Sequence, residues 1–163
     1  MEKSGLLKIQ GKTKEQYLVF RYRSLRFKFM TDKKDTKAKI LMIEEDGFLR
    51  KIYKNKFSLA GFDFSEATNG EEGLNKIITE SPSLVLLDLI LPKKNGFDVL
   101  VEMRGNEKIK NTPVIILSNL AQEKDIERGM SLGAKDYLIK PEVSLSEVVD
   151  RTKECLAKIE LKK

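Results

Sequence analysis

The sequence predicts an α/β protein with a doubly wound, five-stranded parallel sheet. Short apolar runs of four or five residues recur along residues 37–163, and apolar residues at helical spacing follow each run. Continuous apolar runs are typical of strands buried on both faces, and strands that alternate with helices pair in parallel with right-handed crossovers. Several runs also end in a polar residue, at the edge where open parallel sheets bind ligands. Five such units predict a flavodoxin-like strand order, 2-1-3-4-5.

The five expected strands are short and mostly apolar. They span residues 39–44, 63–67, 84–87, 114–117 and 136–139. The third, Leu-Val-Leu-Leu, has no polar residue at all, which indicates a strand buried on both faces. It ends in Asp88, which the strand therefore places at the edge of the sheet where a site is expected.

Five helices are expected between and after these strands. Their apolar residues recur at helical spacing over residues 48–57, 74–78, 97–103, 126–132 and 148–159. Gly61 is expected to end the first helix. The spacings Thr68-x-x-Glu71 and Ser144-x-x-Glu147 predict capping boxes at the start of the second and the last helix.

The composition excludes several classes of site. The chain has 163 residues, which predicts one domain with a sizeable core. It contains no His, so a Ser-His or Cys-His catalytic pair and a His-ligated metal are excluded. The single Cys155 cannot form an internal disulfide and fits a reducing cytosol. No apolar run has the length of a membrane span or a signal peptide, so we expect a cytoplasmic protein.

The positive charge is confined to the first segment. Residues 1–36 carry ten Lys and Arg against four Asp and Glu, whereas residues 37–163 carry 21 of each sign. The asymmetry predicts a basic N-terminal extension, residues 1–36, and a neutral domain, residues 37–163. The basic and aromatic residues of the extension suit a nucleic-acid contact or a membrane-surface anchor. We favour two simpler alternatives: a disordered extension, or a wrongly assigned start in which residues 1–29 precede the natural Met30.

Polar residues end four of the expected strands. Glu45 and Asp46 follow the first, Asp88 the third, Ser118 the fourth and Lys140 the fifth. Each alone could be a cap or a solvated charge, but parallel strand ends lie side by side, so we expect one shared cavity. Three carboxylates in one cavity call for a cation, and oxygen ligands without His or Cys favour Mg²⁺. Asp88 could then attack phosphorus, while Lys140 and Ser118 neutralise and hydrogen-bond the phosphoryl oxygens.

Residues 37–162 resemble the receiver domain of two-component response regulators. The resemblance rests on four motifs in the order and spacing of that family. They are Ile43-Glu44-Glu45-Asp46, Leu87-Asp88-Leu89-Ile90-Leu91-Pro92-x-x-Asn95-Gly96, Ile116-Leu117-Ser118 and Gly133-Ala134-x-Asp136-Tyr137-Leu138-Ile139-Lys140-Pro141.

The resemblance implies a phosphoacceptor and a metal site. Asp88 would take a phosphoryl group from a sensor histidine kinase or a histidine phosphotransfer protein. Asp46 would bind Mg²⁺ directly and Glu45 through a water molecule, with Asp88 and the backbone carbonyl of Ile90 as further ligands. Such a protein is a phosphoacceptor that promotes its own phosphorylation and dephosphorylation, and is not an enzyme in the usual sense.

The resemblance also implies a switch. Ser118 would move toward the phosphoryl group, Tyr137 would change rotamer in response, and Lys140 would pair with Asp88. The Lys140–Pro141 bond is expected to be cis, since cis bonds are nearly confined to proline.

The sequence leaves the output open. The resemblance reaches almost to the C-terminus, so we expect a stand-alone response regulator that signals by a phosphorylation-dependent protein contact with an unidentified target. The expected surface is formed by the fourth helix, the fifth strand and the last helix, and a phosphorylation-dependent dimer is one form of that contact. We expect no membrane contact and do not favour nucleic acid as a partner.

Three alternative functions stay open. They are a DNA-binding regulator that uses the basic segment, a degenerate receiver scaffold, and a phosphatase of the haloacid dehalogenase type. The last needs Asp-x-Asp, whereas Asp88 is followed by Leu89 and Ile90.

Overall fold

A computed structural model describes residues 37–161, and the basic extension predicted at 1–36 lies outside this range. The five predicted strands form one sheet in the predicted order β2-β1-β3-β4-β5, and every neighbouring pair is parallel. The strands are β1 (Lys39–Ile43), β2 (Asp63–Ala67), β3 (Leu84–Leu87), β4 (Val114–Ser118) and β5 (Asp136–Ile139).

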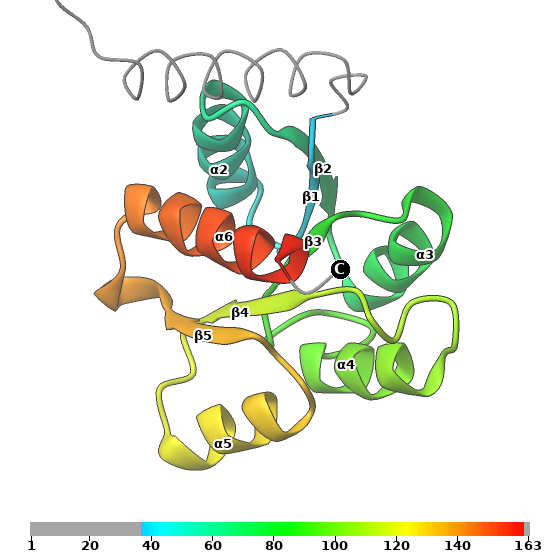
Figure 1. Cartoon of the computed structure of the whole chain (residues 1–163). Coiled ribbons are helices and arrows are strands. Elements are labelled where there is room, and N and C mark those ends of the chain that lie inside the picture. Colours follow the sequence, from blue (N-terminus) through cyan, green and yellow to red (C-terminus); the bar gives the residue numbers. More distant parts are fainter. Residues whose placement is uncertain (1–36, 162–163) are drawn as a thin grey trace, which may run out of the picture. The chain divides into compact units, whose positions relative to one another are not determined.

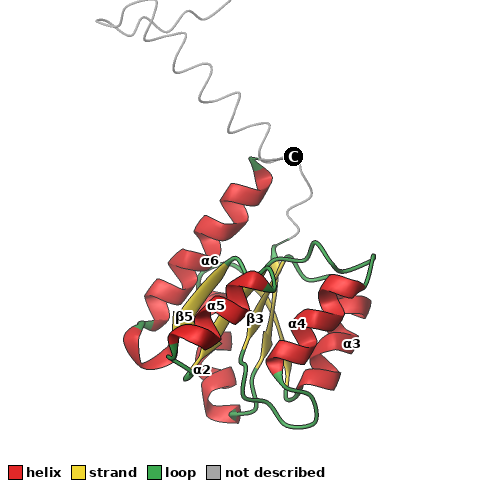
Figure 2. Ribbon diagram, turned by 90° about the horizontal axis from the view of Figure 1, so that it is seen from below, coloured by secondary structure: helices red, strands yellow, loops and turns green. Residues whose placement is uncertain are grey.

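Helices cover both faces of this sheet (Figures 1 and 2). The described residues contain the five predicted helices and one short 3₁₀ helix, η1 (Lys140–Glu142). The five are α2 (Gly47–Leu59), α3 (Gly70–Glu80), α4 (Gly96–Gly105), α5 (Glu123–Ser131) and α6 (Leu145–Glu160). None of the helices in residues 37–161 is both long enough and apolar enough to cross a bilayer.

The apolar strands supply side chains to two separate cores. Because successive side chains of a strand point to opposite faces, Leu41 and Val85 join one cluster, whereas Ile40 and Leu84 join the other. All four are fully buried. The first cluster includes side chains of α3 and α4, and the second packs against α2 and α6 through residues such as Phe57. The central strands are therefore covered on both faces, as their uninterrupted apolar runs predict.

Two local predictions differ from the structure. The second helix is capped one residue later than expected: Asn69 accepts from the amide of Glu72, whose carboxylate in turn accepts from the amide of Thr68. No peptide bond in the described range is cis, so the predicted cis bond before Pro141 is wrong. Pro141 lies in the first turn of η1, where its fixed φ suits a helical turn and the trans form is the intrinsic preference.

Candidate functional site

Lys140 joins two buried carboxylates at one edge of the sheet. Its ammonium donates to Asp88 Oδ2 at 2.7 Å and to Glu44 Oε2 at 2.5 Å. Glu44 is 2% exposed and Asp88 is 6% exposed. Two carboxylates shielded from water in this way would repel each other strongly, and the cation between them offsets that repulsion.

The sheet itself brings these three residues together. Ile43 and Leu87, the last residues of β1 and β3, are register partners, so Glu44 and Asp88 follow neighbouring strands at the same edge. The amide of Asp88 donates to the carbonyl of Ile43 at 3.0 Å and continues the ladder one step past the strands. Lys140 follows β5, and its long stem spans the distance to β1 and β3. The sequence-predicted convergence of Asp88 and Lys140 is thus present in the structure.

The environment of Lys140 keeps its ammonium charged. Burial is the largest single influence and lowers the pKa of Lys140, but the hydrogen bonds and charges of Asp88 and Glu44 together outweigh it, so the pKa is raised. At neutral pH the group is therefore a fixed positive charge beside Asp88. A phosphoryl oxygen arriving at Asp88 would meet that charge directly.

The acidic residues after β1 differ in burial and in contacts, and the predicted roles of Asp46 and Glu45 as Mg²⁺ ligands stay predictions. Asp46 is exposed and is the N-cap of α2, where its Oδ1 accepts from the amides of Phe48 and Leu49. Glu45 is also exposed, and its side chain has no hydrogen bond or ion pair to another residue within 37–161. The acid that shares the cluster with Asp88 and Lys140 is Glu44, which the sequence did not single out.

Asp88 has a second carboxylate oxygen that faces the loop after β3. Oδ1 accepts from the amide of Ile90 at 3.1 Å. This hydrogen bond orients the carboxylate and holds the backbone of Ile90 beside it. Ile90 itself is half exposed. The predicted role of the Ile90 carbonyl as a metal ligand remains a prediction.

Ser118 and Tyr137 both hydrogen-bond to the backbone of one loop residue, Leu120. Ser118 is fully buried at the end of β4, and its Oγ accepts from the amide of Leu120 at 3.4 Å. The Tyr137 hydroxyl donates to the Leu120 carbonyl at 2.8 Å. Burial, together with the charges of Asp125 and Asp88, raises the pKa of Tyr137 to about 12, so the phenol remains a donor at neutral pH. The backbone of Leu120 therefore connects Ser118, at the end of β4, with the side chain of Tyr137 on β5.

The site contains the kinds of ligand atom that a hard cation prefers, but their side chains do not converge on one point in this structure. No group of three or more acidic, His or Cys side chains able to hold a metal occurs among the described residues. The carboxylates of Glu44 and Asp88 and the carbonyl of Ile90 are nevertheless the oxygen donors that Mg²⁺ takes in proteins. Glu45 can change rotamer without breaking a bond to another described residue, and that change would add a third carboxylate.

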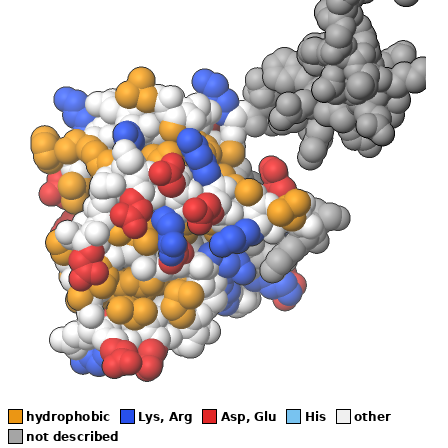
Figure 3. All heavy atoms as spheres, turned by 60° about the vertical axis from the view of Figure 1, so that its left-hand side comes forward, with side chains coloured by type: hydrophobic (Ala, Val, Ile, Leu, Met, Phe, Trp, Pro, Cys, Tyr) orange, Lys and Arg blue, Asp and Glu red, His pale blue; other side chains and the backbone are white. Residues whose placement is uncertain are grey.

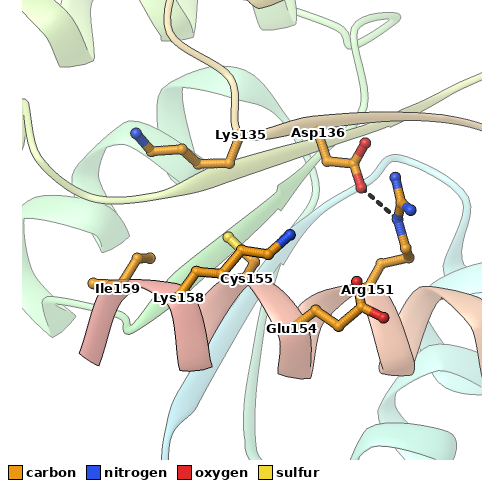
Figure 4. A pocket seen from close by; sticks show the side chains of 7 residues that line it. All are labelled: Lys135, Asp136, Arg151, Glu154, Cys155, Lys158 and Ile159. Atoms are coloured by element: carbon orange, nitrogen blue, oxygen red, sulfur yellow. Dashed lines mark hydrogen bonds and ion pairs between the residues drawn. The ribbon is translucent and has the colours of Figure 1, made fainter. Parts of the chain in front are cut away.

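A groove between β5 and α6 contains none of the predicted site residues. It holds about 250 Å³ and is lined by Lys135, Asp136, Arg151, Glu154, Cys155, Lys158 and Ile159 (Figure 4). Two of its lining residues, Arg151 and Asp136, form an ion pair of 2.7 Å. Burial raises the pKa of the Cys155 thiol, which makes that group a weak nucleophile.

Comparison with known proteins identifies the family. The family model for the response regulator receiver domain matches residues 40–153. The chain belongs to the response regulator receiver domain family, as the motifs and the fold indicate. Among solved structures, the receiver domain of the Francisella response regulator 1452 shares 31% sequence identity at a TM-score of 0.70, over 75% of this chain and 98% of that one. A CheX-CheY-BeF₃-Mg²⁺ complex from Borrelia burgdorferi shares 27% identity at a TM-score of 0.67, over 72% of this chain and 87% of that one.

Two similar curated proteins are regulators of transcription. "Probable transcriptional regulator ycf27" of Porphyridium aerugineum is 37% identical over 124 residues, which are 76% of this chain and 50% of the relative. "DNA-binding dual master transcriptional regulator RpaA" of Synechocystis is 36% identical over 103 residues, which are 63% of this chain and 43% of the relative. The chain thus spans about half the length, or less, of these relatives.

Proposed function

We propose that this protein accepts a phosphoryl group on Asp88 from a sensor histidine kinase or a histidine phosphotransfer protein, and that the modification switches its contacts. The observation that carries the proposal is the bridge from Lys140 to Asp88 and Glu44 at the carboxyl edge of the sheet. Membership of the receiver family supports it. The protein would be a phosphoacceptor that assists its own modification and not an enzyme acting on a separate substrate.

The transfer requires a nucleophile, a positive charge and a hydrogen-bond donor. An oxygen of Asp88 would form a bond to phosphorus as the bond from phosphorus to the donor nitrogen breaks, which leaves an acyl phosphate on Asp88. The ammonium of Lys140 would neutralise a phosphoryl oxygen, and the hydroxyl of Ser118 would donate to another. Burial of the site strengthens both interactions, because little water competes there.

We include Mg²⁺ in this proposal on the chemistry of the donor set. The carboxylates of Asp88, Glu44 and Glu45 and the carbonyl of Ile90 would hold the ion, whereas Asp46 caps α2. When bound, the ion supplies charge neutralisation at the phosphoryl oxygens. The structural relative from Borrelia burgdorferi contains Mg²⁺ and BeF₃, which supports this assignment.

The direct test uses a small phosphodonor. Full-length protein is incubated with acetyl phosphate and MgCl₂, and its intact mass is measured. We expect a gain of one phosphoryl group in the parent and no gain in Asp88→Asn, which keeps the shape of the side chain. An equal gain in the variant would show that another residue is the acceptor and would contradict the proposal.

The output surface that we propose is the face of α5, β5 and α6. The Leu120 loop connects Ser118 to Tyr137, and Tyr137 lies on β5, so a movement of Ser118 would be transmitted to this face. Figure 3 brings forward the side of the molecule that lies on the left of Figure 1. Acidic, basic and hydrophobic side chains are interspersed on it.

Control of transcription is the second candidate, and the relatives favour it. Both relatives described above are transcriptional regulators, and one is described as DNA-binding. The expectation that nucleic acid is not a partner has no support from them. Within this chain, the cationic residues 21, 23, 26 and 28 of the basic segment are the candidate DNA contacts.

This second candidate is tested by the salt dependence of DNA binding. Fluorescence anisotropy would compare the full chain with a full-length variant that has Gln at those four positions. Binding that weakens with salt in the parent and is lost in the variant would support a DNA contact by this segment. If neither protein binds duplex DNA at low salt, a contact by this segment is excluded.

A further inference from the structure

Arg50 binds the backbone of the acidic turn after β1. Its Nη1 donates to the carbonyl of Glu44 at 2.7 Å and to the carbonyl of Glu45 at 2.8 Å. On its other side, Nε lies 3.7 Å from the carboxylate of Glu66 on β2. The Arg50 side chain is only 18% exposed. One guanidinium therefore connects the turn that carries Glu44 and Glu45 to the neighbouring strand.

These contacts determine where two carboxylates can point. The Glu44 side chain is already bound to Lys140 and to the amide of Asp46, so its backbone cannot shift without straining those bonds. Glu45 has no such side-chain anchor among the described residues, and its direction depends on the backbone that Arg50 holds. If Arg50 is removed, two carbonyls lose their donor and the turn gains freedom.

We propose that Arg50 is a positioning residue that holds residues 44–46 in place and thereby strengthens divalent-cation binding at Glu44, Glu45 and Asp88. The inference rests on the proposed function, because it assumes that the cation binds there. Arg50 itself would touch neither the cation nor the phosphoryl group. It acts through the backbone of the residues that would.

The charge of Arg50 predicts the opposite effect. A guanidinium close to a cation site repels the cation, so loss of its charge alone would make Mg²⁺ bind more tightly. Loss of its hydrogen bonds would make Mg²⁺ bind more weakly, because the ligands would have to be ordered on binding. The sign of the change in affinity therefore separates a positioning role from a purely electrostatic one.

The experiment measures Mg²⁺ affinity in the absence of any phosphodonor. Amide NMR spectra of the full chain are recorded during a titration with MgCl₂, for the parent, Arg50→Gln and Arg50→Lys. We expect Arg50→Gln to weaken binding by about tenfold, a typical effect for a residue that orients a metal ligand. Arg50→Lys keeps the charge but lacks the planar fork, so we expect a smaller loss in the same direction.

The matched control is Lys51→Gln, which removes the same charge from the exposed neighbouring position. Binding in this variant should equal that of the parent or be slightly tighter. The inference is overturned if Arg50→Gln binds Mg²⁺ as tightly as the parent or more tightly. It is also overturned if Arg50→Lys matches the parent, which is the result to rely on should Arg50→Gln fail to fold. If the parent shows no Mg²⁺-dependent shifts near Asp88, the proposed function itself is contradicted and the inference falls with it.

Discussion

Lys140 is the residue on which the proposed site depends, because the same contacts would serve both stability and phosphoryl transfer. Its ammonium is the cation that contacts the two buried acids Glu44 and Asp88 in the described part of the chain. Buried ion pairs of this kind are costly to desolvate, and the loss of the ammonium leaves the buried carboxylates without a compensating charge. The same ammonium is placed where a phosphoryl oxygen would arrive.

We predict that Lys140→Met destabilises the fold by about 3 kcal/mol at pH 7, because two buried carboxylates then face each other without a counter-ion. Urea unfolding measures the loss. The double variant Lys140→Met with Asp88→Asn should recover part of it, since one of the two charges is gone. A double variant that is no more stable than the single one would contradict this account.

The contribution of Lys140 to stability also depends on pH. In the parent, the pKa of Lys140 is raised, so this contribution is complete below the ordinary value of 10.5 and is lost as pH rises through the folded value.

The cap of α3 gives a second pH-dependent prediction. The hydrogen bond from the Thr68 amide outweighs burial and lowers the pKa of Glu72 from 4.5 to about 2. A lowered folded-state pKa adds stability that is present above pH 4.5 and is lost as pH falls toward 2. Glu72 is about one-third exposed, so solvent screens the effect, and Glu72→Gln should cost only about 0.5 kcal/mol at pH 7.

Thermal unfolding at pH 7 and pH 2.5 would check this difference between parent and Glu72→Gln, which should shrink at the lower pH. Glu71→Gln, one position earlier on the exposed side of the same turn, is the control and should change stability less. A cost that stays constant between the two pH values would show that the lowered pKa is not its source.

Most residues of the site could be predicted from the sequence, because each ends an apolar run. Asp88 and Lys140 directly follow β3 and β5, and Ser118 is the last residue of β4. Parallel strands place such residues at one edge of the sheet. Three consecutive acids follow β1, and a pattern cannot tell which of them points inward. The structure ends β1 at Ile43, so Glu44 is the buried one and Asp46 becomes the cap of α2.

Gly96, the first residue of α4, packs closely against the backbone of the loop after β3. A Cβ at Gly96 would stand 2.3 Å from the carbonyl oxygen of Asp88 and 2.7 Å from the Cα of Leu89. Both are backbone atoms of the loop that carries Asp88, so neither can move cheaply. At Gly105, the last residue of α4, a Cβ would have no atom within 4 Å apart from its chain neighbours and the backbone of its own helix.

We therefore predict that Gly96→Ala destabilises the protein by about 1–3 kcal/mol through overpacking. Gly105→Ala should be neutral or stabilising by up to about 1 kcal/mol, because Ala is the better helix former. Chemical denaturation of the two variants, one at each end of the same helix, measures both effects. Equal stabilities would mean that the loop after β3 yields easily and does not hold Asp88 firmly.

The helices and strands were predictable to within a few residues, whereas their ends were less so. The periodicity marks α3 through Leu74 and Ile77, but Asn69 competes with Thr68 for the capping position and wins in the structure. Both are good caps, and only the position of the first helical residue decides between them. The isomer of the Lys140–Pro141 bond could not be predicted from the sequence either, because it depends on the surrounding turn and not on the proline alone.

The molecule as a whole combines a neutral receiver domain with a basic segment. The receiver fold places Asp88 at one edge of the sheet. In the same fold, the backbone of Leu120 connects Ser118, at the end of β4, to Tyr137 on β5. The two curated relatives described above are transcriptional regulators, and the chain covers about half of each or less, so control of transcription by this protein is a proposal. What the domain contacts after phosphorylation is therefore a separate question from whether Asp88 is phosphorylated.

The central claim, that Asp88 is the phosphoacceptor, is tested most directly by trapping the acyl phosphate. Full-length protein treated with acetyl phosphate and MgCl₂ is reduced with borohydride, which converts an aspartyl phosphate to homoserine, and its peptides are sequenced by mass spectrometry. Homoserine should appear at position 88 alone, and only in the sample that received the phosphodonor. Homoserine at another acidic position, with unmodified Asp88, would contradict the account.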